Sequence, residues 1–465
     1  MLRRICCGLC CLFAFPVLAG DAADASALLT LAGSNTIGQR LAPELARAFA
    51  RQRGYRIQGE ETPAFDEQRL VLAKDGRSQS IYIAAHGTGT GLAALQQGQA
   101  DLWMASRAAS REEIAQSQAA LGRLDDPGQE NVIALDGVAV IVAQAHPLRS
   151  LRMDQVRGIF EGSIGNWSKL GLKPAPIRVL ARDDHSGTYD TFKSIVLGGT
   201  ALSARAERFE STEALALAVA GDPLAIGFVG LGGVGPARAL ALAYPGMAAI
   251  APSPLAVATE DYPLARRLLL YSAARPSAVA RDFLEFALGP QGQKIAAEIG
   301  FVSQEPALYE QPLPRNAPAD YREFTEGALR ISINLRFGDG LSYLDSKALR
   351  DLDRIAHFLR RRPRSENALI LLGFSDAHEG NPIQSVHMAE NRADYVALEL
   401  ARRGIGAERV RGIGQALPVA PNNEERGRAK NRRVELWLRP LTPVAGTSSP
   451  PASGHGSAGT SAQTP

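Results

Sequence analysis

The sequence of 465 residues contains no cysteine after residue 11 and no long apolar run after its first twenty residues. Its four cysteines, Cys6, Cys7, Cys10 and Cys11, all lie in the N-terminal stretch MLRRICCGLCCLFAFPVLAGDA. If that stretch is removed, the remaining chain has no thiol, which excludes disulfide frameworks, thiolate metal sites and cysteine nucleophiles. The net charge is only +3, which is too small to indicate a nucleic-acid-binding protein.

The N-terminal stretch has the parts of a secretory signal peptide. Arg3 and Arg4 supply the positive charge, and residues 5–18 form an apolar run that is too short to span a bilayer. Small residues precede a predicted cleavage site after Ala19. We therefore expect residues 1–19 to be a signal peptide and the mature protein to be exported to the periplasm. A buried N-terminal helix is the alternative interpretation.

The rest of the chain divides into four segments. Residues 25–305 alternate apolar strands with amphipathic helices, which predicts an α/β fold with mostly parallel sheets. Residues 306–329 are rich in proline and show no periodicity, so we expect a linker. Residues 330–440 show a second, smaller α/β pattern. Residues 441–465 carry proline, serine and glycine without charge, which predicts a disordered tail.

Three strand-to-helix turns of the larger segment have similar compositions: GSNTIG at 33–38, GTGTG at 87–91 and RDDHSGT at 182–188. Each places hydroxyl and glycine residues at a predicted helix N-terminus, where free N–H groups and the helix dipole favour an anion. Any one of them alone is better explained as an ordinary helix cap. Three turns of one type, one of them with an arginine, predict a site for a tetrahedral oxyanion.

These turns, with VAVIVAQAHPLRSLRMDQVRGIFEGSIGNWSKLG at 138–171 and FLEFALGPQGQKIAAEIGFV at 283–302, resemble the PstS-like periplasmic phosphate-binding proteins of ABC transporters. The resemblance implies a type II solute-binding fold whose two lobes close on phosphate or a similar oxyanion, with no cofactor and with an ABC permease as a partner. It assigns ligand binding to Thr36, Ile37, Thr88, Arg182, Ser186, Gly187 and Thr188.

Arg107 departs from this family, which has an aspartate here that accepts the proton of hydrogen phosphate. If Arg107 points into the cleft, the site gains a donor and loses an acceptor, and sulfate becomes an acceptable ligand. The alternative is a rim residue that pairs with solvent or with Asp136. A ligand-free structural or signalling module of the cell envelope therefore stays open as a second hypothesis.

We expect neither enzymatic activity nor a metal site. Asp184, His185 and Ser186 include the residue types of a catalytic triad, but sequence neighbours do not usually point their side chains into one relay. No cluster of His, Asp and Glu has metal-ligand spacing.

The smaller segment contains GFSD at 373–376, HMAENRA at 387–393 and NRRVE at 431–435. A carboxylate at Asp376 and a guanidinium at Arg392 match the two ends of a zwitterion. A surface salt bridge of little energetic value is the simpler interpretation.

These motifs resemble the OmpA C-terminal family of peptidoglycan-binding domains, an α/β sandwich. The resemblance implies that Asp376 and Arg392 hold the diaminopimelate of the peptidoglycan stem peptide and tether the protein to the cell wall. The separation of these two residues is one longer than usual, and Ser385 stands where asparagine is common. We therefore expect a remodelled loop.

Overall fold

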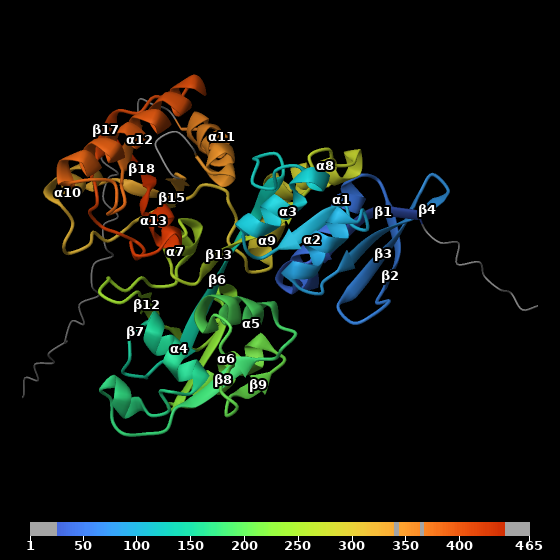
Figure 1. Ribbon diagram of the computed structural model, residues 1–465, viewed down its shortest axis with the longest axis horizontal. Helices are drawn as coiled ribbons and strands as arrows, with labels where there is room; N and C mark the ends of the chain where they lie inside the picture. Colours follow the sequence, from blue (N-terminus) through green and yellow to red (C-terminus); the bar gives the residue numbers. More distant parts are fainter. Residues whose placement is uncertain (1–25, 339–343, 363–366, 442–465) are drawn as a thin grey trace, which may run out of the picture.

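The computed structural model describes residues 26–338, 344–362 and 367–441, which form two lobes and a C-terminal domain (Figure 1). The expected signal peptide at 1–19 and almost all of the expected tail at 441–465 lie outside the described residues. Strands and helices alternate through all three parts, which confirms the predicted α/β class.

Lobe I, blue and cyan in Figure 1 apart from two yellow helices, is built around strand β1, which pairs in parallel with β4 and β5. Strands β2, β3 and β4 follow one another as antiparallel neighbours. The strands are β1 (Ser26–Gly33), β2 (Arg56–Glu61), β3 (Glu67–Lys74), β4 (Arg77–Ala84) and β5 (Leu102–Ala105). The helices are η1 (Ile37–Leu41), α1 (Ala42–Gln52), α2 (Thr88–Gln96), α3 (Arg111–Leu121), α8 (Ala278–Leu288) and α9 (Pro290–Glu298).

Lobe II, green in Figure 1, has a parallel centre in which β8 pairs with β9 and β10. Its strands are β7 (Ser150–Arg152), β8 (Arg178–Arg182), β9 (Glu207–Phe209), β10 (Ala225–Gly230), β11 (Arg238–Ala239) and β12 (Ala241–Ala243). Its helices are α4 (Met153–Glu161), η2 (Trp167–Leu170), α5 (Gly187–Phe192), η3 (Lys193–Leu197), α6 (Thr212–Gly221), η4 (Leu231–Gly233) and α7 (Pro254–Ala258).

Two long strands, β6 (Glu130–Val142) and β13 (Ala265–Tyr271), connect the lobes. β6 pairs antiparallel with β13 over its first half and with β10 over its second half, so it belongs to both lobes. All of its residues after the first are buried, because helices cover both faces of the sheet. Because the pairings of β6 and those among β2, β3 and β4 are antiparallel, the whole sheet is mixed rather than mostly parallel.

The C-terminal domain, orange and red in Figure 1, contains a five-stranded sheet in the order β14-β15-β18-β16-β17. Apolar side chains of α11 and α12, among them Leu352, Ile355, Val396 and Leu400, pack on one face of it. Its strands are β14 (Leu308–Tyr309), β15 (Leu329–Arg336), β16 (Asn367–Gly373), β17 (Arg409–Gly412) and β18 (Arg433–Pro440), and its helices are α10 (Ala319–Thr325), α11 (Ser346–Arg360), α12 (Pro382–Arg402) and α13 (Glu425–Asn431).

Residues 306–329, expected as a linker, contain strand β14 and helix α10 and pack against this domain. Tyr321 of α10 is 1% exposed, with its ring 6.0 Å from the ring of Trp437, and its hydroxyl donates to Glu435 at 3.1 Å. A helix of only seven residues among prolines has too few turns to produce a periodic pattern, so the sequence did not reveal it.

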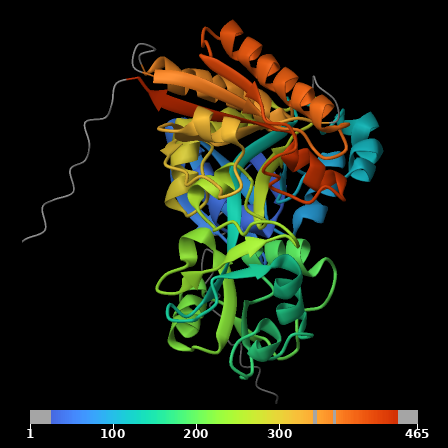
Figure 2. The ribbon, with the colours of Figure 1, turned by 90° about the vertical axis from the view of Figure 1, so that its left-hand side faces the viewer.

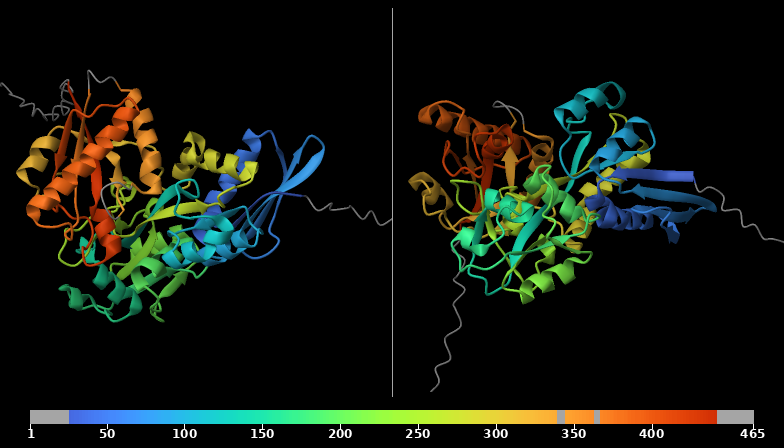
Figure 3. Two further views of the ribbon diagram at one scale, coloured as in Figure 1. Left: turned by 45° about the horizontal axis from the view of Figure 1, so that its top comes forward. Right: turned by 60° about the horizontal axis from the view of Figure 1, so that its bottom comes forward.

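The C-terminal domain lies directly against the hinge and both lobes (Figures 2 and 3). Near lobe I, Arg350 of α11 donates to the carbonyl oxygen of Glu130 at 2.6 Å and to Asn131 at 2.8 Å. Near lobe II, Asn334 donates to the carbonyl oxygen of Thr259 at 3.1 Å. At the centre, Arg267 of β13 pairs with Asp345 at 2.7 Å. The domain therefore spans the hinge.

A buried ion cluster holds this contact together. Glu260 pairs with Arg267 at 3.0 Å and lies 4.0 Å from Arg336. Burial alone would raise the pKa of Glu260, but the charges of Arg267 and Arg336 lower this pKa to about 2. The cluster joins Glu260, which precedes β13, to Arg336 of strand β15 in the C-terminal domain.

Asp345 has two functions that substitution can separate. One oxygen caps α11 by accepting from the amide of Ala348 at 2.7 Å, and the other pairs with Arg267. Asp345→Ser keeps the cap and removes the ion pair. We expect this variant to lose about 1–3 kcal/mol of stability and to unfold in two calorimetric transitions instead of one, because a buried guanidinium loses a charged partner.

Asp345→Ala should lose about 1 kcal/mol more, since it also removes the cap. In the wild type, the contribution of Glu260 is present above its ordinary pKa of 4.5 and is lost as the pH falls toward 2, so acid should also separate the transitions. An Asp345→Ser variant that unfolds like the wild type would contradict this role of the ion pair.

Candidate functional site

The two lobes meet where two of the predicted turns face each other. Thr36 follows β1 in lobe I and donates its hydroxyl to the carbonyl oxygen of Gly187 in lobe II at 2.9 Å. A Cβ atom on Gly187 would lie 2.4 Å from the Cα of Thr36, so only glycine allows this approach. Gln39 also crosses the cleft and donates to the carbonyl oxygen of His185 at 2.5 Å. The predicted convergence of turns 33–38 and 182–188 is therefore present.

Arg266 of hinge strand β13 supplies a buried positive charge at this point. Its Nη2 donates to the hydroxyl of Thr36 at 2.6 Å and to the carbonyl oxygen of Gly187 at 3.0 Å. Its Nε donates to Asp136 of β6 at 3.2 Å. Arg266 is 7% exposed and Asp136 is 6% exposed. Burial lowers the pKa of Arg266, and Asp136 opposes this effect.

Sequence reasoning missed Arg266, although a signal was present. The segment ARRLLLY at 265–271 places two adjacent arginines in an otherwise apolar strand. Arginine is almost never buried without a partner, so such a pair indicates two specific charged contacts. Because successive residues of a strand point to opposite faces of the sheet, the contacts of the two arginines must lie on opposite faces.

The second predicted turn lies beside the first. Gly87 donates its amide to the carbonyl oxygen of Gly33 at 2.8 Å. Thr88 begins α2, and its hydroxyl lies 3.1 Å from that of Ser106 and accepts from the Ser106 amide at 3.2 Å. Ser106 is thus a further hydroxyl at this turn, which the sequence analysis did not identify.

The remaining predicted residues of the first and third turns mainly cap helices or pack in the core. Ser186 is buried and caps α5 by accepting from the amide of Tyr189 at 3.4 Å. Ile37 is buried in the core of lobe I, and Thr188 is half-buried in the first turn of α5. A π-helical segment follows the contact residue of each lobe: η1 follows Thr36, and η3 continues the helix α5 that Gly187 begins. Such segments are frequent at functional sites.

Arg107 and Arg182 contact other partners. Arg107 is 44% exposed and makes two 2.7 Å hydrogen bonds to Glu113, which the Ser110 cap of α3 holds in place. The expected alternative partner, Asp136, is held by Arg266 instead. Arg182 donates to Thr212 at 2.5 Å and to the carbonyl oxygen of Phe209 at 3.2 Å. Both guanidinium groups are therefore engaged away from the Thr36–Gly187 contact.

Carboxylates surround the cleft. A cavity of about 260 Å³ next to Gln39 is lined by acidic side chains, Glu60, Glu61, Asp66 and Glu67. Asp190 of α5 also belongs to this region, and burial raises its pKa while Arg266 acts in the opposite direction. An anion here must be held by local geometry around Arg266 rather than by a positive field.

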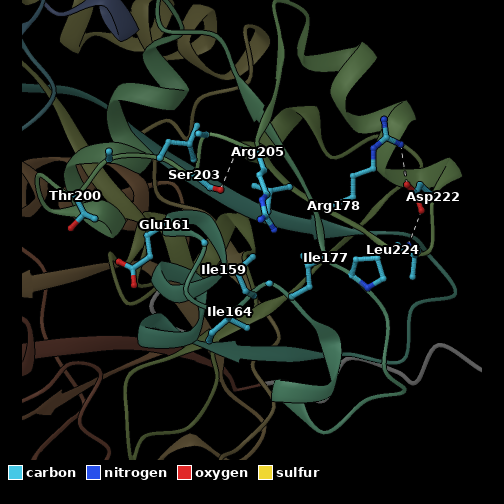
Figure 4. Close-up of a pocket in the computed structure, with 17 residues that line it drawn as sticks. Ile159, Glu161, Ile164, Ile177, Arg178, Thr200, Ser203, Arg205, Asp222 and Leu224 are labelled. Carbon is cyan, nitrogen blue, oxygen red and sulfur yellow. Dashed lines mark hydrogen bonds and ion pairs between the residues drawn. The ribbon is translucent and has the colours of Figure 1, made fainter.

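A larger cavity of about 900 Å³ lies in lobe II and shares none of the cleft residues (Figure 4). Ile159, Ile164 and Ile177 form part of its apolar wall. At one side Arg178 pairs with Asp222 at 3.0 Å. The lining combines this apolar wall with charged side chains, Glu161, Arg178, Arg205 and Asp222, and none of the three predicted turns contributes to it.

In the C-terminal domain, Asp376 and Arg392 are both buried, and each has its own partner. Asp376 follows β16 and accepts from Arg432 at 2.8 Å and from the amide of His378 at 2.6 Å. Arg392 of α12 pairs with both oxygens of Glu379, one at 2.6 Å, and donates to the carbonyl oxygen of Phe374 at 3.3 Å. Sequence reasoning did not single out Glu379, which lies in the loop between Asp376 and α12.

Comparisons with known proteins agree with this division of the chain. A family model described as a PBP superfamily domain matches residues 20–291, and the OmpA family model matches residues 336–432. The phosphate-binding protein PstS of Bacillus subtilis is 27% identical over 242 residues, which cover 50% of this chain and 77% of that protein. The probable lipoprotein YiaD of Escherichia coli is 33% identical over 115 residues, which cover 24% of this chain and 51% of that protein.

Among solved structures, an ABC-type phosphate transport receptor from Vibrio cholerae matches with 23% identity and a TM-score of 0.47, and covers 59% of this chain and 99% of that one. The family model of the N-terminal part spans more than half of the chain, and the lobes, hinge and facing turns agree with it. The chain therefore belongs to the PBP superfamily, as a PstS-like protein fused to a C-terminal OmpA-like domain.

Proposed function

We propose that the protein captures phosphate between its two lobes and is held at peptidoglycan by its OmpA-like domain. The observation that carries the first part is Arg266, a buried guanidinium at the contact between Thr36 and Gly187. The relatives named as phosphate-binding proteins support the choice of ligand. The protein acts as a binder and not as an enzyme.

The geometry supports binding by closure of the lobes. Arg266 and Thr36 are donors that an oxyanion accepts from, and charge-assisted hydrogen bonds of this kind are strong in a buried site. A ligand between the lobes replaces the direct hydrogen bond from Thr36 to Gly187 with contacts from both sides. Such a ligand binds the closed arrangement better than an open one and shifts the lobes toward closure.

Carboxylates near the contact favour phosphate over sulfate. Hydrogen phosphate can donate a proton to a carboxylate, whereas sulfate has no proton to donate. Asp136 and Asp190 are the acidic groups next to Arg266. They supply the acceptor that the family aspartate would provide, since position 107 is an arginine bound to Glu113.

For the second part, the buried Asp376 and Arg392 of the OmpA-like domain hold the ammonium and carboxylate groups of a diaminopimelate side chain in the stem peptide. Within residues 26–338, 344–362 and 367–441, no helix has both the length and the hydropathy to cross a bilayer. The site of action in this proposal is the periplasm. The resemblance to the PstS-like binding proteins of ABC transporters supports an ABC permease as the recipient of the anion.

Titration calorimetry of the purified protein with phosphate and with sulfate tests the ligand. We expect phosphate to bind and Arg266→Lys to weaken binding by about 10–100-fold, because a single ammonium nitrogen cannot replace both the Nε that binds Asp136 and the Nη2 that reaches Thr36 and Gly187. Arg107→Gln is the matched control and should bind like the wild type. If neither anion produces heat, the ligand-free envelope module is favoured. If Arg107→Gln loses phosphate binding while Arg266→Lys keeps it, Arg107 and not Arg266 holds the anion.

Gly187→Ala tests closure. The added methyl group collides with the Thr36 backbone, so we expect the lobes to stay apart and phosphate binding to be lost. Small-angle X-ray scattering with phosphate should show a larger radius of gyration for the variant than for the wild type. Gly89→Ala, at an open position of the second turn, is the control. Unchanged scattering and affinity would contradict this contact as the closure point.

Pull-down on purified sacculi tests the wall site. Arg392→Ala and Asp376→Ala should each abolish most retention, because each removes the group that pairs with one end of the zwitterion. Arg409→Ala, which removes a half-exposed arginine of the same domain, is the control. If both variants are retained like the wild type while remaining folded by circular dichroism, the tethering proposal fails.

A further inference from the structure

Glu379 lies in the loop between β16 and α12 and contacts the Arg392 guanidinium with both carboxylate oxygens. One of these oxygens also accepts from the amide of Asp376 at 3.2 Å. The guanidinium packs over the ring of Phe337 at 5.6 Å. A single internal carboxylate therefore bridges the two residues that we propose to bind the stem peptide.

These contacts are those that a ligand carboxylate would make. Glu379 occupies the edge of the planar guanidinium that Nη1 and Nη2 form, so a second carboxylate cannot bind these two nitrogens at the same time. The Arg392 side chain is completely buried, whereas Glu379 is 13% exposed. A ligand that approaches from outside thus meets Glu379 first.

The local sequence holds Glu379 in this position. Gly380 follows it with a φ of 93°, a left-handed conformation that glycine adopts easily. A Cβ atom on Gly380 would lie 2.4 Å from the side-chain oxygen of Gln384, which together with Asn381 caps α12. The turn therefore fixes the direction of the chain between Glu379 and the helix that carries Arg392.

We infer that Glu379 is an internal ligand of Arg392 that a stem-peptide carboxylate must displace, and that it sets the affinity for the cell wall. This inference rests on the proposed wall binding. If the Glu379–Arg392 pair is formed in about nine molecules of ten, only about one in ten can bind, and the apparent affinity for the stem peptide falls about tenfold. The protein then binds the wall weakly enough to exchange, which suits a binder that must also reach a partner.

The test is binding of the purified full chain to isolated sacculi that contain diaminopimelate, measured over a range of sacculus concentrations. Glu379→Gln removes the charge and keeps an oxygen that can accept from Arg392. Glu379→Asp keeps the charge on a side chain too short for the same contacts. Glu408→Gln removes the charge of an exposed glutamate elsewhere in the domain and serves as the control.

We expect Glu379→Gln to bind about tenfold more tightly than the wild type, Glu379→Asp to bind more tightly by a smaller factor, and Glu408→Gln to match the wild type. If Glu379→Gln does not fold, Glu379→Asp decides by the same criterion. If Glu379→Gln binds sacculi no more tightly than the wild type while Arg392→Ala loses binding, the inference is overturned and the proposed wall binding stands. Retention of Arg392→Ala at the wild-type level overturns both.

Discussion

The buried ion pair between Arg266 and Asp136 is the contact on which the arrangement of the lobes depends. It joins the two hinge strands at 3.1 Å, where both side chains are removed from water. A buried charge without a partner is strongly destabilising, so the pair fixes how β6 and β13 lie together. From that position Arg266 reaches Thr36 of one lobe and Gly187 of the other.

The next residue of the same strand performs the corresponding task on the other face. Arg267 points away from the cleft and pairs with Glu260 and Asp345, which joins the hinge to the OmpA-like domain. Two successive residues of β13 thus contact the cleft on one side and the C-terminal domain on the other, as the alternation of a strand requires. The interlobe cleft and the OmpA-like domain therefore share one structural element.

Arginine pairing also organises the OmpA-like domain. Arg432 holds Asp376, Glu379 holds Arg392, and Arg433 pairs with Glu435 beneath the ring of Phe374. Each of these arginines is buried and lies near a carboxylate that compensates its charge. In the proposed function, a zwitterion that binds at this place exchanges one partner for another, because these charges are already compensated.

The amino-acid sequence by itself determined the features that depend on local order. Hydrophobic periodicity indicated the α/β class, and the turns at 33–38 and 182–188 were placed correctly because strand ends and helix starts have local signatures. The motifs at 373–376 and 387–393 likewise indicated a strand end before Asp376 and a helix that carries Arg392, and both are present.

The tertiary structure decided which charged groups meet. Arg107 and Arg182 lie in the expected motifs, yet nearby partners, Glu113 and Thr212, hold them, while Arg266 enters the cleft from a strand 79 residues away from Gly187. The tertiary structure also decided the packing of residues 306–329 against the C-terminal domain and the contact of Glu379 with Arg392. Pairing of buried charges depends on distances between segments that are remote in sequence, and no local pattern records those distances.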